Sequence, residues 1–143
     1  AKAAGKTIVL PQDVRVADAS GVALCRALSE VSEGDAILDI GPQTALVIRE
    51  TVLSAHTVYW NGPLGCFERP DFAAGTRALG QAVADSKAVS LAGGGDTVSA
   101  IDDAGVVSGI THISTAGGAF LSYLESGSLP MIDFLKQDLM ERT

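Results

Sequence analysis

The sequence lacks any hydrophobic run long enough to span a bilayer, and it has no signal-peptide pattern. We therefore expect an ordered cytoplasmic domain that does not bind membranes. Basic side chains are also scarce, with 10 Lys and Arg against 17 Asp and Glu, which gives a net charge of -7. A surface for nucleic acid needs clustered Lys and Arg, but here they are scattered, so no nucleic-acid partner is expected.

Cysteine is nearly absent, and the two that occur, Cys25 and Cys66, have no metal-ligand spacing. Reduced thiols are the simplest interpretation. The sequence also has no linker, low-complexity tract or clear repeat, so its 143 residues form one domain or part of one. Neither a Gly-x4-Gly-Lys-Ser/Thr loop nor a Gly-x-Gly-x-x-Gly fingerprint is present, which weakens the case for other nucleotide-dependent enzymes on a similar sheet.

Apolar spacing predicts that strands alternate with helices along most of the chain. Strands are expected at residues 7–10 and 14–17, bent near Pro11, at 36–40 as a buried strand, and at 56–60 and 88–92. Helices are expected at residues 43–55 and 72–85, from Thr97, from Gly118, and at 132–139. Residues 20–31 remain open between a helix and an irregular connection. The alternation predicts an α/β fold: a parallel sheet with helices on both faces, as part of a Rossmann-like three-layer domain.

An apolar strand at residues 91–92 runs into three glycines and then Asp96 and Thr97 at a helix start. Glycine lets backbone N–H groups approach an anion closely, and the helix start adds unpaired N–H groups and a positive dipole end. The Asp96 carboxylate can hold hydrated Mg²⁺, and the Thr97 hydroxyl can donate to a phosphate. The alternative is that these two residues only cap a helix.

A second turn of the same design occupies residues 112–120, where a short strand leads through Gly117 and Gly118 into a helix. Two such turns in consecutive βα units place two helix starts along one edge of a parallel sheet, where open α/β folds bind ligands. Glycines that serve only close helix packing are the alternative.

A third segment, residues 59–68, leaves a strand as a loop with apolar residues and ends at Glu68. Such a loop can cover a flat heterocycle while Glu68 accepts hydrogen bonds from ribose hydroxyls. Taken alone, the loop is equally typical of a surface turn with a solvated glutamate.

Together, these segments resemble phosphoglycerate kinase in order and spacing over nearly the whole chain. The resemblance rests on TIVLP at 7–11, ILDIGP at 37–42, WNGPLGCFE at 60–68, AGGGDT at 92–97, ISTAGGAF at 113–120 and LP at 129–130. The combination is far more specific than any single glycine cluster. Ala116 departs from the pattern, since the family often has a glycine there, and the turn must then form with a negative φ or at a modest steric cost.

The resemblance implies reversible phosphoryl transfer between 1,3-bisphosphoglycerate and ADP, giving 3-phosphoglycerate and ATP in glycolysis, with Mg²⁺ as cofactor. It also implies a role for each matching residue. Leu38, Pro63 and Cys66 border the adenine, Glu68 binds the ribose, and Asn61 lies beside the phosphates. Gly94, Gly95, Asp96 and Thr97 form the phosphate and Mg²⁺ turn, while Gly117 and Gly118 face the phosphoryl group in transfer.

The resemblance further implies that residues 1–143 correspond to the C-terminal nucleotide-binding domain without its first strands. The N-terminal domain, which binds 3-phosphoglycerate or 1,3-bisphosphoglycerate, has no counterpart in these residues. The chain begins at Ala1 and has no Lys or Arg in the glycine-rich motifs, so we expect a fragment that is inactive alone, from an enzyme that is monomeric at full length. A non-catalytic module that binds nucleotide or a partner chain remains the alternative.

Overall fold

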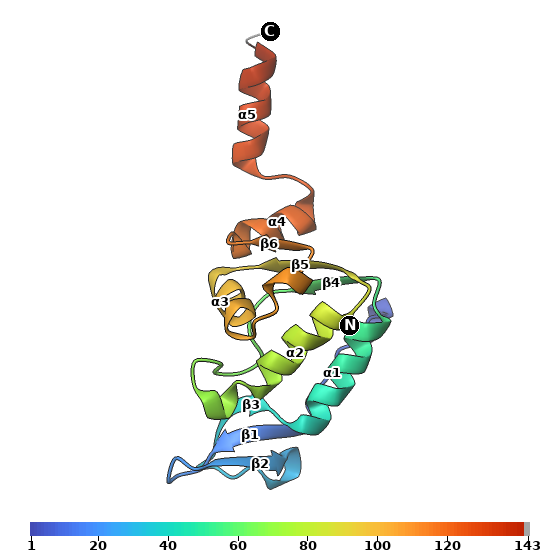
Figure 1. Ribbon diagram of the computed structural model, residues 1–143. Coiled ribbons are helices and arrows are strands. Elements are labelled where there is room, and N and C mark those ends of the chain that lie inside the picture. Colours follow the sequence, from blue (N-terminus) through green and yellow to red (C-terminus); the bar gives the residue numbers. More distant parts are fainter. Residues whose placement is uncertain (142–143) are drawn as a thin grey trace.

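The computed structural model describes residues 1–141 and contains two small sheets connected by helices (Figure 1). The strands are β1 (Asp13–Ala17), β2 (Ala23–Ala27), β3 (Ala36–Ile40), β4 (Thr57–Trp60), β5 (Val89–Gly93) and β6 (His112–Ser114). The α-helices are α1 (Pro42–Ser54), α2 (Ala74–Asp85), α3 (Gly95–Asp103), α4 (Gly117–Ser126) and α5 (Pro130–Glu141). The helices expected from sequence all form, with ends shifted by a few residues.

The second half of the chain builds a parallel sheet with the strand order β4-β5-β6. Trp60 pairs with Ala92, and Ala92 pairs with Ile113 on the next strand. The carboxyl ends of the strands therefore lie at one edge of the sheet. This register brings together the three segments with ligand-binding motifs, residues 59–68, 91–97 and 112–120.

Helices α1, α2 and α3 cover one face of the parallel sheet. The core there combines Trp60 and Ala92 of the sheet with Val52, Val83 and Ile101, one from each helix. Ile101 and Val83 are 0% and 1% exposed. Fully burying an aliphatic side chain of this size contributes about 1.5–3 kcal/mol, so this cluster is what holds the helices against the strands.

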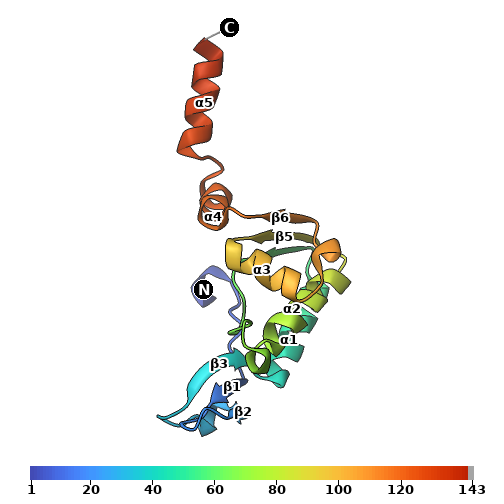
Figure 2. The same ribbon diagram turned by 60° about the vertical axis from the view of Figure 1, so that its left-hand side comes forward.

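Helix α4 lies against the opposite face (Figure 2). Side chains alternate along a strand, so Tyr59 faces away from the core that holds Trp60. Its ring meets Phe120 of α4 edge to face, with 5.2 Å between ring centroids. Helices thus lie on both faces of the parallel sheet, which confirms the α/β class.

The first half of the chain builds an antiparallel sheet, β2-β1-β3, which was not expected from the sequence. Residues 20–31, left open between a helix and a loop, form a hairpin strand and a 3₁₀ turn at Leu28–Glu30 instead. The hairpin turn is closed by Asp18, whose Oδ1 accepts hydrogen bonds from the backbone N–H groups of Ser20 and Val22. Pairing with β1 overrides the helical spacing of Leu24 and Leu28.

Two further strand predictions need correction. Residues 7–10 form no strand, and Ile8 and Leu10 are 68% and 72% exposed, because this segment pairs with no strand among the described residues. Residues 36–40 do form a strand, but it is not the buried one we expected. Ile37 is 55% exposed, whereas Asp39 is buried.

The antiparallel sheet fixes where α1 begins. The buried carboxylate of Asp13 in β1 accepts hydrogen bonds from the backbone N–H groups of Gln43 and Thr44, and from the Thr44 hydroxyl. These N–H groups belong to the first turn of α1, where they have no partner within the helix. A residue from another element thus caps the helix.

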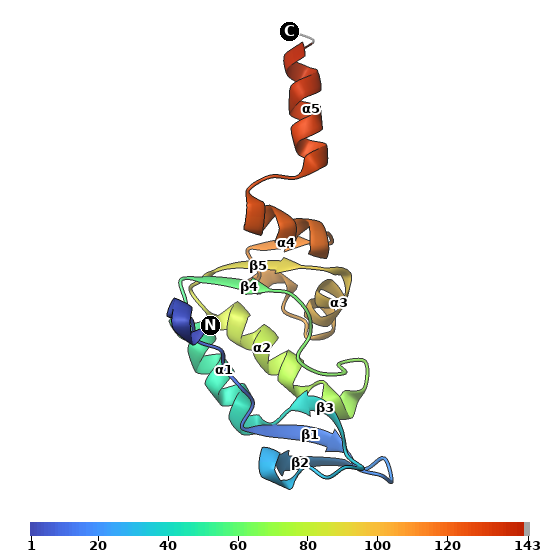
Figure 3. The same ribbon diagram turned by 180° about the vertical axis from the view of Figure 1, so that it is seen from behind.

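Helix α5 extends away from the rest of the chain in all three views (Figure 3). Its start is fixed by Ser128, whose hydroxyl donates a hydrogen bond to the Asp133 carboxylate. Within residues 1–141, no helix is both long and apolar enough to cross a membrane.

Candidate functional site

The carboxyl edge of the parallel sheet brings the two glycine turns into contact. Gly94 has φ = +102°, a value that side chains other than glycine rarely adopt, and its N–H donates to the Ser114 carbonyl at 3.1 Å. A Cβ at Gly117 would lie 2.9 Å from the Cα of Gly94. Gly94 is therefore required by its conformation and Gly117 by the closeness of the two turns.

Gly95 and Gly118 are less constrained. A Cβ at either position would meet no atom within 4 Å. Gly95 is the first residue of α3 and Gly118 is the second residue of α4, and both are exposed. Their backbone N–H groups therefore belong to the first turns of two helices that start at the same edge. Ala116, just before α4, has φ = -87°, which confirms that the turn forms without a positive φ at that position.

Asn61 lies beside both turns. Its Nδ2 is 4.0 Å from the position that a Cβ on Gly94 would occupy, and 3.8 Å from the corresponding position on Gly117. The same amide donates a hydrogen bond to the Tyr59 hydroxyl at 3.3 Å. Asn61 is exposed. It is thus close to the two helix starts without being buried by them.

Thr97 is buried, whereas Gly95 and Asp96 of the same turn are exposed. Its side chain is 1% exposed, and its hydroxyl oxygen accepts a 2.7 Å hydrogen bond from the N–H of Gly62. The Trp60 indole N–H in turn donates to the Gly62 carbonyl at 2.8 Å. Thr97 therefore ties the loop after β4 to the first turn of α3.

Asp96 is exposed in the first turn of α3. Among residues 1–141, no group of three or more His, Cys, Asp or Glu side chains is placed to hold a metal ion. A single exposed carboxylate beside a glycine-rich helix start fits Mg²⁺, since this ion keeps several waters and is shared with substrate phosphates. It does not fit a metal held entirely by protein ligands.

The loop after β4 folds back onto β3. The Cys66 N–H donates to the Leu38 carbonyl at 2.8 Å, so the two residues expected to border an adenine are neighbours. Pro63 is half-buried in the same loop, while Glu68 is exposed. The loop therefore holds Cys66 against Leu38 and leaves the Glu68 carboxylate exposed two residues further on.

Two residues that hold this loop were not identified from the sequence. The Thr76 hydroxyl accepts hydrogen bonds from the N–H groups of Leu64 and Gly65, each at 3.2 Å. The Asp39 carboxylate accepts from the N–H of Gly75 at 2.8 Å, at the start of α2, and packs where a Cβ on Gly65 would be. The sequence could have indicated a role for Asp39, because it is the one acidic residue in the otherwise apolar stretch 36–40.

Asp39 is also electrostatically perturbed. Its burial raises the pKa of the carboxyl above the ordinary value, and this effect outweighs the opposing hydrogen bonds from Gly75 and Ile40 and the charge of Arg15. The group links β3, the loop and α2 from a single buried position.

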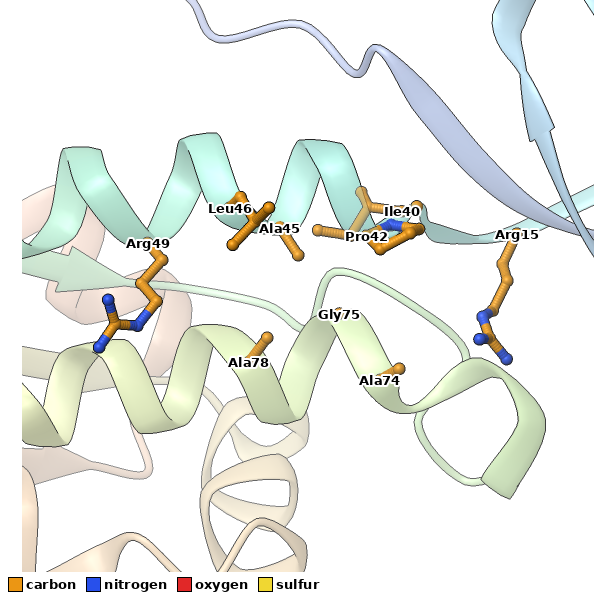
Figure 4. Close-up of a pocket in the computed structure, with 10 residues that line it drawn as sticks. Arg15, Ile40, Pro42, Ala45, Leu46, Arg49, Ala74, Gly75 and Ala78 are labelled. Atoms are coloured by element: carbon orange, nitrogen blue, oxygen red, sulfur yellow. The ribbon is translucent and has the colours of Figure 1, made fainter.

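An apolar groove of about 360 Å³ lies away from this edge, between α1 and α2 (Figure 4). Leu46 and Ala78 line it, with Arg15 and Arg49 at its two ends. Both arginines have partners: Arg15 donates to the Asp71 carbonyl, and Arg49 pairs with Asp85 at 3.7 Å. The groove contains none of the residues predicted from the motifs to bind a ligand.

The second half of the chain is an α/β unit with an open parallel sheet, and two glycine turns lie at one edge of that sheet. A family model described as phosphoglycerate kinase matches residues 1–127, and the chain belongs to this family. The comparisons with individual proteins agree with this assignment.

A phosphoglycerate kinase of Francisella tularensis is 49% identical over 140 residues, which cover 96% of this chain and 36% of the relative. One from Nitratidesulfovibrio vulgaris is 52% identical over 141 residues, with the same coverage. The solved phosphoglycerate kinase structure from Coxiella burnetii superimposes with a TM-score of 0.86 at 43% identity, over 98% of this chain and 37% of that one. The chain therefore spans little more than a third of these relatives.

Proposed function

We propose that this chain provides the nucleotide side of a phosphoglycerate kinase and binds ADP or ATP with Mg²⁺ at the carboxyl edge of β4, β5 and β6. The contact between Gly94 and Gly117 carries this proposal, because it places the starts of α3 and α4 together. Two helix starts that share one anion supply N–H donors and two positive dipole ends. The whole reaction would be transfer of a phosphoryl group between 1,3-bisphosphoglycerate and ADP.

The chain's own residues would bind and orient the nucleotide. Leu38, Pro63 and Cys66 would border the adenine, Glu68 would accept hydrogen bonds from the ribose, and Asn61 would lie beside the phosphates. Asp96 would be the protein ligand of Mg²⁺, which neutralises phosphate charge when bound. The N–H groups of Gly117 and Gly118 would stabilise the charge on the phosphoryl group in transfer. Thr97 would support the phosphate turn, and its buried hydroxyl favours that role over an exposed phosphate contact.

These residues are suited to binding the nucleotide, but they are not sufficient for the chain alone to catalyse phosphoryl transfer. Segments 61–68, 93–97 and 114–120 contain Glu68 and Asp96 but no Lys or Arg. Phosphoryl transfer builds negative charge that cations must balance. We propose that residues 1–143 are the C-terminal nucleotide-binding part of a larger enzyme, whose other parts supply those cations and the phosphoglycerate site.

Calorimetric titration of the purified chain with ADP, with and without Mg²⁺, tests the proposal. The parent chain should bind MgADP more tightly than ADP alone, and Asp96→Ala should abolish that difference. Asp102→Ala is the matched control, because Asp102 is an exposed carboxylate near the other end of α3. The metal assignment would be wrong if Asp96→Ala kept the full effect of Mg²⁺.

A coupled assay of ATP formation tests the second part. We expect MgADP binding without measurable turnover by the 143-residue chain, even with 1,3-bisphosphoglycerate present. Turnover by the pure chain would contradict the proposal that other parts of the enzyme supply the cations needed for phosphoryl transfer. Absence of nucleotide binding would instead favour a module that binds a partner chain.

A further inference from the structure

We propose that Tyr59 is a positioning residue for the anion site: its hydroxyl holds the Asn61 amide beside the two glycine turns. The inference rests on the proposed function, since it assigns a second role at the same site. Tyr59 is the penultimate residue of β4, and Asn61 follows the strand directly. The Tyr59 side chain lies on the sheet face that meets Phe120 of α4, and the hydrogen bond from the Asn61 amide places the Asn61 side chain beside it.

The position of the Tyr59 hydroxyl is fixed by the turn beneath it. A Cβ at Gly93 would lie 2.8 Å from the Tyr59 hydroxyl oxygen and 3.1 Å from Cδ1 of Phe120. The hydroxyl therefore sits directly above the backbone that leads into Gly94. Only glycine at position 93 leaves room for this arrangement.

The Tyr59 ring is held from the other side by α4. Phe120 packs edge to face on it with 5.2 Å between centroids, and the same Phe120 ring lies 6.4 Å from His112 of β6. Edge-to-face aromatic pairs are favourable beyond their buried area. Tyr59 is thus restrained by elements from both glycine turns, although it belongs to neither.

The hydrogen bond to Tyr59 restricts how Asn61 can face a ligand. A side-chain amide has two N–H donors and one carbonyl acceptor. One N–H of Asn61 is given to the Tyr59 oxygen at 3.3 Å, which leaves the second N–H and the carbonyl oxygen for a ligand. Without this bond, the exposed Asn61 side chain would rotate among several orientations, and ordering it on binding would cost affinity.

Tyr59→Phe removes the hydroxyl and keeps the ring. Tyr123→Phe is a matched control, because Tyr123 is the second tyrosine of the chain and its side chain is 45% exposed on α4. We expect Tyr59→Phe to weaken MgADP binding about threefold, the effect of one modest hydrogen bond, and Tyr123→Phe to leave it unchanged. Asn61→Ala should weaken binding at least as much as Tyr59→Phe.

A double-mutant cycle separates positioning from general stability. In the Asn61→Ala background, Tyr59→Phe should have no further effect on MgADP affinity, because the hydroxyl acts through Asn61.

The Asn61 side-chain amide signals in a ¹⁵N NMR spectrum should also move in Tyr59→Phe and stay in place in Tyr123→Phe, with no nucleotide present. The inference would be overturned if the parent and Tyr59→Phe bound MgADP equally well. It would also be overturned if Tyr59→Phe weakened MgADP binding as much in the Asn61→Ala background as in the parent chain. Failure of the parent chain to bind MgADP would overturn the proposed function as well, and the two failures are therefore distinguishable.

Discussion

The hydroxyl oxygen of Thr97 and the backbone N–H of Gly62 are joined by a 2.7 Å hydrogen bond across 35 positions of sequence. The bond connects the start of α3 to the loop that follows β4. Gly62 has φ = +94°, so the loop turns sharply just where it is held. The segments proposed to bind the phosphates and the base are therefore joined by one hydrogen bond, whose Thr97 side is buried.

Thr97→Val tests the strength of that contact. Valine has nearly the shape of threonine but cannot accept a hydrogen bond, so the Gly62 N–H would lose its partner. An unpaired buried donor costs about 1–3 kcal/mol, which should appear as a lower free energy of unfolding in denaturant titrations. Thr97→Ser keeps the hydroxyl and loses one buried methyl group, about 0.8 kcal/mol. Equal or smaller destabilisation by valine than by serine would contradict this role.

Asp13 should make the chain sensitive to acid. Burial tends to raise its pKa, but hydrogen bonds from Gln43 and Thr44 more than offset this and hold the pKa below the ordinary 3.8. The unfolded chain then binds the proton more readily, so the contribution of Asp13 to stability is present above pH 3.8 and is lost as the pH falls through the lower, folded pKa. Asp13→Asn should flatten this loss in unfolding curves recorded at successive pH values. An unchanged slope would show that Asp13 does not cap α1 as a carboxylate.

Asp39 should have the opposite effect on the pH dependence of stability from that of Asp13. Burial raises its pKa, so the folded chain binds the proton more readily than the unfolded chain does. Stability should therefore fall as the pH rises from 3.8 through the higher, folded pKa, and level off above it. Asp39→Asn should remove this fall, although its amide can accept only one of the two backbone hydrogen bonds at Ile40 and Gly75. A persistent fall in the Asp39→Asn variant would assign it to another group.

Gly75→Ala should be strongly destabilising, although alanine normally favours helices. A Cβ at Gly75 would overlap the Asp39 carboxylate and the Ile40 side chain. Overpacking a tight site typically costs about 1–3 kcal/mol in the free energy of unfolding. Gly118→Ala is the matched change on α4, where nothing lies within 4 Å of the new Cβ, and it should be neutral or slightly stabilising. Similar thermal melting of the two variants would refute the close packing of Asp39 on α2.

The sequence predicted the parallel half of the fold well because each of its elements has a strong local signal. The glycines at the end of β5 and at the start of α4 mark the two turns, and apolar spacing marks the helices on either side. The roles of Leu38, Glu68 and the other nucleotide residues remain predictions, since they come from the family resemblance. For Ala116, a negative φ and a modest steric cost were both open from the sequence, and the structure has the negative value, φ = -87°.

The antiparallel half was predicted poorly because its strands depend on partners distant in sequence. Leu24 and Leu28 have helical spacing, yet β2 pairs with β1 along its full length. Residues 7–10 have a typical strand composition, but composition cannot provide a neighbouring strand. The buried pattern expected for residues 36–40 failed for the same reason, since Ile37 finds no covering layer among the described residues.

The sequence by itself determined the α/β class and the two glycine turns, because glycine and apolar spacing act over a few neighbouring positions. The order and spacing of its motifs also identified the family through their resemblance to phosphoglycerate kinase. The tertiary structure alone decided which of these residues meet. It placed Gly117 against Gly94, turned the Thr97 hydroxyl toward Gly62, and brought Tyr59 to Asn61 above Gly93. These contacts depend on the register of three parallel strands and on the packing of α4, and no local spacing encodes either.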